Sequence, residues 1–162
     1  MHTQANFSQR SRDNPGLQAN LEAIMNPSDD ELRSLLLSTR TIAVVGASSK
    51  PDRPSYGVFA RLLQAGYRVI PVNPFEQVVH GQRAYPTLAS IPEPVDLVDV
   101  FRRAEDTPAI ADEAVTIGAK VLWLQLGIVN EAARARAAAG GLTVVMDACL
   151  AVVVARFGVR IA

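Results

Sequence analysis

Residues 41–59, TIAVVGASSKPDRPSYGVF, decide the fold prediction, because they read as a strand, a turn and the start of a helix. The first five are short, apolar and mostly β-branched, and Gly46 marks the turn that ends the strand. A glycine-rich dinucleotide fingerprint would place further glycines two and five residues after Gly46, where this chain has Ser48 and Pro51. The stretch therefore predicts a strand–turn–helix unit with a longer and more polar loop than that fingerprint allows.

The remainder of the chain alternates strand-type apolar stretches with helix-type amphipathic ones. We expect five core strands, in TIAVVG, YRVIPVNP, VDLVDVF, KVLWLQLG and LTVVMD. The segment around Gly81 leaves a sixth, short strand open, and residues 87–91 predict a brief helix. Because helices between successive strands require parallel crossovers, the pattern predicts an α/β fold of three layers. Its Rossmann-like, mostly parallel five-stranded sheet would carry helices on both faces.

The N-terminal segment differs from the rest in being polar and without sustained periodicity. We predict a flexible N-terminal arm over residues 1–27, with a short helix within 17–25, and a single domain over residues 28–162. In PSDDELRSLLLSTR, Ser28 is the expected N-cap of a helix, and Glu31 is its capping-box partner. The closing ACLAVVVARFG predicts a final helix, and its apolar residues 150–157 would support a homodimer.

Composition limits the classes of function. The 162 residues suit one domain, and the 16 basic residues balanced by 16 acidic ones argue against nucleic-acid binding. No apolar stretch approaches the ~20 residues of a membrane span. The opening stretch lacks the apolar centre of a secretory signal, and the single Cys149 excludes an internal disulfide and a metal site of its own. We expect a protein of the reducing cytoplasm that holds no metal and binds neither membrane nor nucleic acid.

The turn after the first strand is the strongest candidate for a ligand site. Ligands of an open α/β sheet bind outside the carboxyl ends of the strands, where the strand order reverses. Gly46 permits a turn closed to residues with a Cβ, and the small Ala47 and Ser48 let backbone N–H groups approach a ligand. The hydroxyls of Ser48 and Ser49 can donate to phosphate oxygens. The turn therefore favours a phosphate-bearing ligand.

Arg53 lies in the same loop, between Pro51 and Pro54. The prolines restrict the backbone and lower the entropy cost of presenting the guanidinium, whose planar donors suit a phosphate. Ser55 is expected to cap the following helix, with its positive end facing the same pocket. The alternative is a proline-rich surface loop with a solvated arginine.

The end of the second strand lacks the acid that a nicotinamide or flavin dinucleotide site presents to the ribose. Asn73 stands there in PVNP, and Glu76, beyond Pro74, is expected to lie on a different path. Asn73 can bond a ribose or adenine edge, or it can serve only as a turn former. The missing acid and the missing glycines both weigh against NAD.

The ends of the third and fourth strands supply four more candidates. Phe101 either caps the core or offers a flat apolar surface to a ligand, and Arg102 either adds positive charge or is solvated. Strand alternation places Trp123 and Gln125 on one side of KVLWLQLG. Tryptophan alone is more typical of a core, whereas a polar Gln125 among leucines indicates a partner.

The motifs VVGAS, RPS, GYRVIPVNP, GQRAYPTLASIP, VDLVDVFRR and VLWLQLG, in this order and spacing, resemble the stand-alone CoA-binding proteins of bacteria and archaea. Those proteins are similar to the Rossmann-like CoA-binding domain of the succinyl-CoA synthetase α subunit. The resemblance runs from Leu36 to Phe157 and implies that coenzyme A, or an acyl-CoA, lies across the strand ends.

The resemblance also implies a role for each group of candidate residues. The residues implied to hold the diphosphate are Gly46, Ala47 and Ser48, with further phosphate contacts from Arg53 and Ser55. Those implied to flank the adenosine are Pro71, Val72, Asn73 and Pro74. Those implied to border the pantetheine path are Phe101, Arg102, Trp123, Gln125 and Gly127.

The stretch after the last strand departs from the family pattern. Family members commonly have Asp-Arg-Cys there, and this chain has Asp147, Ala148 and Cys149. The loss of the basic side chain removes any contact it would make, and Asp147 is left to orient Arg102 or a ligand hydroxyl. We interpret Cys149 as a small buried hydrophobic residue rather than a thiol-exchange partner.

Few residues of the sequence suit catalysis. His2 and His80 are not placed at the strand ends, and no pair of carboxylates converges on the proposed pocket. We therefore predict a non-catalytic module that binds or senses CoA or acyl-CoA through its phosphates and adenosine, alone or with an unidentified protein partner. Two alternatives stay open: an NAD(P)-binding oxidoreductase-like protein, and an interaction scaffold with a vestigial nucleotide site.

Overall fold

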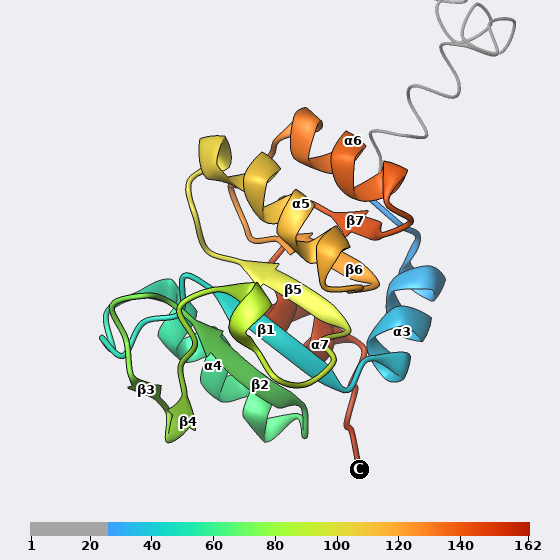
Figure 1. The fold of residues 1–162 in the computed structure, drawn as a ribbon. Helices are drawn as coiled ribbons and strands as arrows, with labels where there is room; N and C mark the ends of the chain where they lie inside the picture. The colour runs from blue at the N-terminus through green and yellow to red at the C-terminus, as the bar shows by residue number, and fades with distance from the viewer. Residues whose placement is uncertain (1–25) are drawn as a thin grey trace, which may run out of the picture.

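The computed structural model describes residues 26–162 and places a parallel sheet between two layers of helices (Figure 1). Its five strands lie in the order β2-β1-β5-β6-β7, and every neighbouring pair is parallel. Their bounds are β1 (Thr41–Val45), β2 (Arg68–Val72), β5 (Leu97–Val100), β6 (Val121–Leu124) and β7 (Thr143–Val145). The predicted α/β fold with a five-stranded Rossmann-like sheet is confirmed.

The short strand left open in the prediction does not join this sheet. Residues 78–83 form a separate antiparallel hairpin of β3 (Val78–Val79) and β4 (Gln82–Arg83). His80 and Gly81 form its turn, both with positive φ, at 49° and 75°. One parallel bridge between Val72 and Tyr85 ties the hairpin's return segment to β2. The brief predicted helix is present as η1 (Leu88–Ser90).

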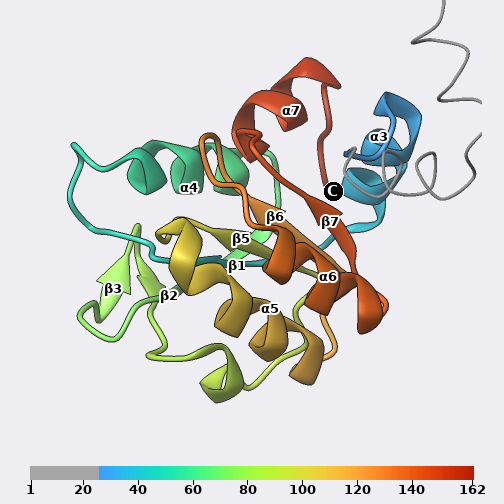
Figure 2. The same cartoon turned by 90° about the horizontal axis from the view of Figure 1, so that it is seen from above.

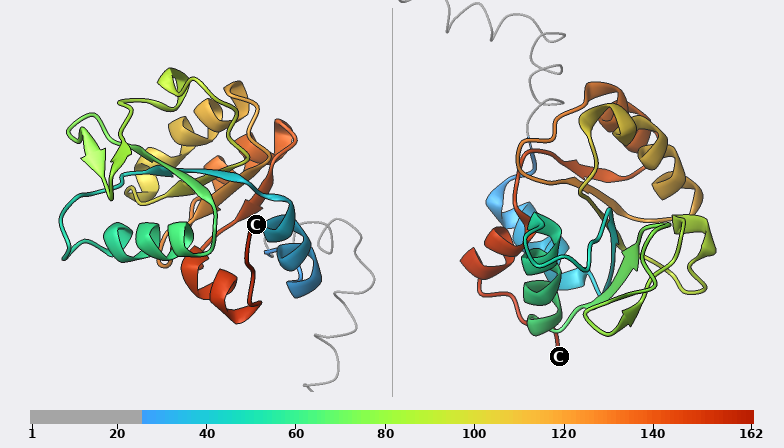
Figure 3. Two further views of the ribbon diagram at one scale, coloured as in Figure 1. Left: turned by 90° about the horizontal axis from the view of Figure 1, so that it is seen from below. Right: turned by 90° about the vertical axis from the view of Figure 1, so that its left-hand side faces the viewer.

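Helices cover both faces of the sheet, as Figure 2 shows from above and Figure 3 from two other sides. One face carries α3 (Asp29–Ser38), α4 (Pro54–Gln64) and α7 (Leu150–Arg156). The other carries α5 (Thr107–Thr116), preceded by η2 (Ala104–Asp106), and α6 (Glu131–Ala139). Each layer buries its apolar side chains against one face of the sheet. The core therefore consists of two apolar clusters, one on each face.

Alternation within β6 divides its side chains between the two cores, as predicted. Val121 and Trp123 pack on the side of α4 and α7, and Leu122 and Leu124 pack on the side of α5 and α6. Trp123 is fully buried, and its indole Nε1 donates a hydrogen bond of 2.8 Å to the carbonyl of Ala148. The tryptophan therefore anchors the chain between β7 and α7.

The two helix starts predicted by capping have different outcomes. For α3, the Ser28 hydroxyl accepts a 3.2 Å hydrogen bond from the Glu31 amide, so Ser28 is the N-cap as expected. For α4, the expectation that Ser55 is the cap is wrong, because Arg53 occupies the cap position and Ser55 lies buried in the first turn. Pro54 sets this start, since its fixed φ and missing N–H suit the first helical position.

The predicted arm mostly lies outside the described residues, and so does the helix predicted within 17–25. Its last part is seen at Asn26, whose side-chain amide exchanges two hydrogen bonds, of 2.7 and 2.8 Å, with the backbone of Met146 just after β7. Within residues 26–162, no helix is long and apolar enough to cross a membrane.

The closing helix α7 uses its apolar residues inside the domain. Leu150, Ala151, Val153 and Val154 are buried against the sheet, and Val152 is 54% exposed. The apolar character of residues 150–157 is thus largely explained by intramolecular packing, and the homodimer stays a prediction.

Candidate functional site

The strand order reverses between β1 and β5, because the chain leaves β1 toward β2 and later returns to β5 on the other side. A cavity of about 860 Å³ opens at the carboxyl ends of these strands, where an open α/β sheet is expected to bind its ligand. The structure brings eight of the predicted residues together around it: Gly46, Ser48, Arg53, Ser55, Asn73, Phe101, Arg102 and Gln125.

Gly46 forms the turn at the base of the cavity, with a φ of +86°. A Cβ at this position would lie 2.4 Å from the carbonyl oxygen of Phe101, so only glycine fits. The Gly46 amide is bonded to the carbonyl of Val72, whereas the amides of Ala47 and Ser48 have no hydrogen-bond partner among residues 26–162. The donor that this turn presents to the cavity is the Ser48 amide, because Ser48 lines the cavity whereas Ala47 is fully buried and does not line it.

Arg53 and the first turn of α4 form the adjoining wall. Arg53 is exposed and forms no ion pair with another described residue. Ser55 is buried and lines the cavity. The positive end of the 11-residue helix α4 faces the same space. A free guanidinium, unbonded amides and a helix N-terminus together form an environment suited to an anion.

Asn73 joins the ends of β1 and β2. Its side-chain Nδ2 donates a 2.9 Å hydrogen bond to the Ala47 carbonyl, and its Oδ1 accepts one of 2.9 Å from the Phe75 amide. Both contacts belong to the turn-forming interpretation, since the side chain organises the two loops. Asn73 also lines the cavity, and its bond to a ribose or adenine edge stays a prediction.

The expectation that Glu76 leaves the site on a different path is wrong. The turn organised by Asn73 folds the chain back, and the Glu76 amide donates to the Asn73 carbonyl at 3.3 Å. Glu76 Oε1 then accepts hydrogen bonds from the amide of Ser49, at 3.2 Å, and from its hydroxyl, at 3.0 Å. A carboxylate therefore occupies donors that the sequence had assigned to a phosphate.

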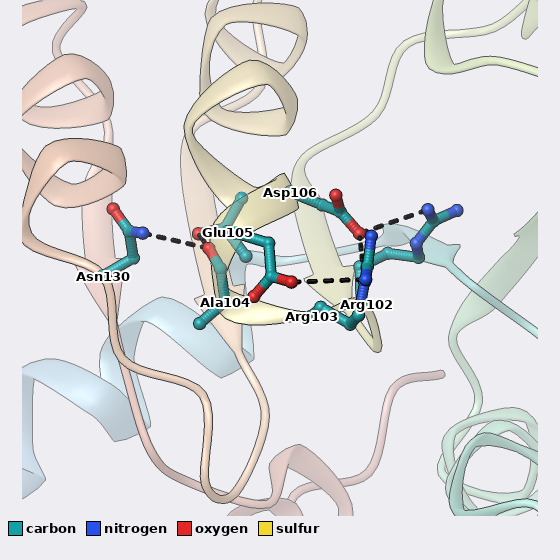
Figure 4. A network of polar contacts seen from close by, with 7 residues as sticks. Arg102, Arg103, Ala104, Glu105, Asp106 and Asn130 are labelled. Atoms are coloured by element: carbon teal, nitrogen blue, oxygen red, sulfur yellow. Dashed lines mark hydrogen bonds and ion pairs between the residues drawn. The ribbon is translucent and has the colours of Figure 1, made fainter.

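Arg102 lines the cavity beside the Gly46 turn, and Figure 4 shows it and Arg103 both directed at Asp106. The Arg102 and Arg103 guanidiniums lie 3.3 and 3.4 Å from Asp106 Oδ2. Partial desolvation raises the pKa of Asp106, but the two arginines outweigh this effect and hold the pKa below its usual value. Asp106, and not Asp147, is thus the partner of Arg102, because Asp147 Oδ1 accepts a 2.7 Å hydrogen bond from the Gly127 amide.

The remaining wall of the cavity is apolar. Its side chains are Val58, Phe101, Leu126 and Ile128, with Cys149 beside them. Cys149 is only partly buried and faces the cavity, so its interpretation as a buried hydrophobic residue is wrong. Cys149 lies between β7 and α7. Because ligands bind at the carboxyl ends of the strands, this position in the sequence could have placed it at the cavity.

The sequence analysis missed Asp99, in the middle of β5. Its side chain is fully buried, and its Oδ1 accepts a hydrogen bond from Nε2 of Gln125, which lines the cavity. Asp99 Oδ2 is buried without a hydrogen-bond partner among the described residues. Burial raises the pKa of the Asp99 carboxyl to about 7, against the smaller opposing effect of the Gln125 hydrogen bond. An acid among the otherwise apolar residues 97–100 was the available signal.

Several predicted site residues do not line the cavity. They are Ala47, Ser49, Pro71, Val72, Pro74, Trp123 and Gly127. Among them Val72 and Trp123 are core residues, and the Gly127 amide is bonded to Asp147. The cavity gains eight residues that the prediction did not include: Lys50, Pro54, Val58, Phe75, Glu76, Leu126, Ile128 and Cys149. Within residues 26–162, no cluster of three or more His, Cys, Asp or Glu side chains could hold a metal ion.

Comparison with known families identifies the domain that contains this cavity. The model of a family described as the CoA binding domain matches residues 40–155, which include every cavity residue. The chain belongs to the CoA-binding domain family. This confirms the resemblance drawn from the sequence motifs. The CoA-binding domain spans the whole sheet and stops within α7.

The relatives of this CoA-binding domain are of two kinds. An uncharacterized protein of Bacillus subtilis, YneT, is 43% identical over 129 residues, 80% of this chain and 96% of that protein. A hypothetical protein from Pyrococcus horikoshii has a solved structure with 36% identity and a TM-score of 0.79, covering 81% of this chain and 92% of that one. These relatives have about the size of the present chain.

The second kind is much longer. The α subunit of an ADP-forming acetate–CoA ligase I of Pyrococcus furiosus is 30% identical over 108 residues, which are 63% of this chain and 21% of the subunit. A dinucleotide-forming acetyl-coenzyme A synthetase of Ca. Korarchaeum cryptofilum has a solved structure with 27% identity and a TM-score of 0.61. It is matched over 70% of this chain and 27% of its own. This chain thus corresponds to a minor part of each ligase.

Proposed function

We propose that this protein binds coenzyme A or an acyl-CoA through its phosphates and adenosine at the carboxyl ends of the strands, as a non-catalytic binding or sensor module. The observation that carries the proposal is the division of one cavity into an anion-binding wall and an apolar wall. Coenzyme A has the same division, because its phosphates lie at the nucleotide end and its long arm ends in a thiol.

The donor set at the first loop fits the phosphates. The free amide of Ser48, the guanidinium of Arg53 and the start of α4 all border the cavity. Charge-assisted hydrogen bonds of this kind are about twice as strong as neutral ones. Lys50 lines the same side and adds a second positive charge. This wall supports binding of a ligand with more than one phosphate group.

The adenosine would lie near the end of β2. Phe75 lines the cavity with 93% of its surface exposed, so its ring is accessible to a ligand. A purine ring stacked on Phe75 would cover that surface and gain the energy of an aromatic contact. Asn73, held in place by Ala47 and Phe75, would flank the same group.

The side chains around the cavity favour binding over chemistry. Among the described lining residues there is no histidine, and the carboxylate of Glu76 is bonded to Ser49. Two of the three basic lining side chains, Lys50 and Arg53, stand beside the first loop, where they would meet phosphates. A module that reports CoA occupancy to a protein partner, or to a second copy, is the role we propose for it.

Thermal unfolding with added ligands tests the proposal. A ligand present at 100 times its Kd should stabilise the protein by about 2.7 kcal/mol. We expect coenzyme A and acetyl-CoA to raise Tm, and NAD and NADP to have little effect at the same concentration. A larger shift with NADP would favour the oxidoreductase alternative, and no shift with any of the four would favour the scaffold.

A further inference from the structure

Asp99 is a buried carboxyl group that the binding of phosphates does not use. It lies on β5 between β1 and β6, in register with Val44 and Trp123, and all three side chains are fully buried. Burying a carboxyl group among apolar neighbours is costly unless it is hydrogen-bonded, and no cation lies beside it among residues 26–162. The one hydrogen bond that Asp99 makes among the described residues, with Gln125, therefore indicates its role.

That contact fixes the orientation of one amide in the cavity. Gln125 directly follows β6, is 4% exposed and lines the cavity, and its Nε2 donates to Asp99 Oδ1. A carboxylate can only accept, and a carboxylic acid protonated on Oδ2 still accepts at Oδ1. In both states the nitrogen of the Gln125 amide turns toward Asp99. The oxygen, Oε1, is then left on the cavity side, with no partner among the described residues.

The surroundings of Gln125 are suited to the arm of the ligand rather than to its phosphates. Leu126 follows it in the chain, the Ile128 amide donates to the Gln125 carbonyl at 2.9 Å, and the Gln125 amide donates to the carbonyl of Val100, next to Phe101, whereas Arg53 lies at the start of α4. The pantetheine arm of coenzyme A is a mostly apolar chain that contains two amide groups. An amide N–H that enters an apolar site needs an acceptor there, because leaving it unpaired costs more than the bond itself contributes.

We propose that Asp99 is a positioning residue, which holds the Gln125 amide so that Oε1 accepts a hydrogen bond from an amide N–H of the pantetheine arm. This inference rests on the proposed function and deepens it. The pair makes the site selective for a nucleotide that carries the arm over one that has only the phosphates and adenosine. Asp99 reaches the ligand only through Gln125.

Isothermal titration calorimetry with two ligands tests this role. Coenzyme A carries the arm, and adenosine 3′,5′-bisphosphate carries phosphates and adenosine without it. Asp99→Leu removes the acceptor and Gln125→Met removes the amide, and we expect each to weaken CoA binding about 3- to 10-fold, the range of one hydrogen bond. Neither should change the affinity for the bisphosphate. Asp99→Asn keeps an acceptor at Oδ1 and should restore CoA affinity to within about twofold of the wild type.

The double variant separates a positioning role from a structural one. If Asp99 acts through Gln125, adding Asp99→Leu to Gln125→Met should weaken CoA binding no further, whereas independent effects would multiply. Equal loss of affinity for both ligands, or an unchanged CoA affinity in Asp99→Leu, would overturn the inference while leaving the proposed function standing. A wild type that binds neither ligand would overturn the proposed function itself.

A second measurement does not depend on the folding of Asp99→Leu. The side-chain amide signals of Gln125, identified in a ¹H–¹⁵N spectrum by their loss in Gln125→Met, should move when coenzyme A is added to the wild-type protein. They should stay in place when adenosine 3′,5′-bisphosphate is added. Signals that respond equally to both ligands would remove Gln125 from the arm and contradict the proposal.

Discussion

The two walls of the cavity differ in how they are built. At the first loop, the donors at the cavity are the amide of the partly exposed Ser48 and the exposed Arg53, and the carboxylate of Glu76 meets Ser49 near solvent. At the ends of β5 and β6, Asp99 and Gln125 are both buried, and their hydrogen bond has no competition from water. The first wall works by charge near solvent. The second works by geometry, through a hydrogen bond between two side chains that are dry although Leu126 beside them is 71% exposed.

A ligand that contacts both walls would be recognised by two kinds of interaction at once. Exposed charges attract a ligand from a distance but are screened by salt, so they distinguish anions poorly from one another. A buried hydrogen bond acts only at contact, and it penalises any ligand that leaves it unmade. The loop wall would therefore govern affinity for phosphates, and the dry wall would govern selectivity for the arm.

The largest expected effect is on the free energy of unfolding, through the titration of Asp99 in the dry wall. Because burial raises the pKa of Asp99 to about 7 from the 3.8 of a free group, the folded state holds a proton that the unfolded state has already lost. The contribution of this group to stability is therefore fully present at low pH and declines as pH rises toward 7. Relative to Asp99→Asn, the wild type should lose on the order of 3 kcal/mol of unfolding free energy between about pH 5 and pH 8.

Urea unfolding of both proteins at the two pH values measures this difference. Asp96→Asn is a matched control, since Asp96 is a partly exposed acid that accepts hydrogen bonds from the amides of Arg40 and Thr41. This variant keeps Asp99, so its stability should decline with rising pH as that of the wild type does. Parallel pH profiles for the wild type and Asp99→Asn would show that Asp99 titrates normally and that the second wall is wet.

An intermediate effect is expected at the loop wall. Arg53→Ala should weaken CoA binding by about 1.5–3 kcal/mol, the range of a hydrogen bond to a charged group, and the loss should shrink at high salt. Arg103→Ala is the control, because Arg103 is an exposed arginine that pairs with Glu105 and Asp106 and does not line the cavity. Calorimetry at two salt concentrations measures both variants. Equal affinities for both would remove Arg53 from the site.

The smallest effect should come from Glu76. Its carboxylate occupies the donors of Ser49 and places a negative charge beside the proposed phosphate site. Glu76→Gln removes the charge, so CoA binding should tighten by less than about 1 kcal/mol, the range of an exposed charge pair. Glu93→Gln, which breaks the exposed ion pair with Arg68, serves as the control. Weaker binding in Glu76→Gln would mean that the carboxylate contacts the ligand favourably.

Much of the fold could be predicted from sequence, because its signals are local. Short apolar strands end at Gly46 and at Asn73, and Ser28 caps α3, so strand, turn and helix starts each have a nearby cause. The start of α4 was misplaced by two residues, because a proline at the first helical position competes with a serine as the start signal. The first loop of the site was predictable for the same local reason.

The parts of the site that were missed depend on contacts between distant residues. Glu76 reaches Ser49 only because an Asn73 turn reverses the chain, and no pattern in the sequence gives the direction of that turn. Asp99 lies in a strand whose other residues are apolar. Its role depends on the hydrogen bond to Gln125, which the pairing of β5 with β6 brings beside it. Trp123 was named as a site residue, but strand alternation sends its ring into the core.

The close fit of Gly46 against the carbonyl of Phe101 has a consequence for the speed of recognition. A turn wedged against the neighbouring strand end has its shape before any ligand arrives, so its amides need no reordering during an encounter. Association at this loop would then be limited by diffusion and steering rather than by folding of the loop. Slow conformational adjustment, where it occurs, would have to arise elsewhere in the molecule.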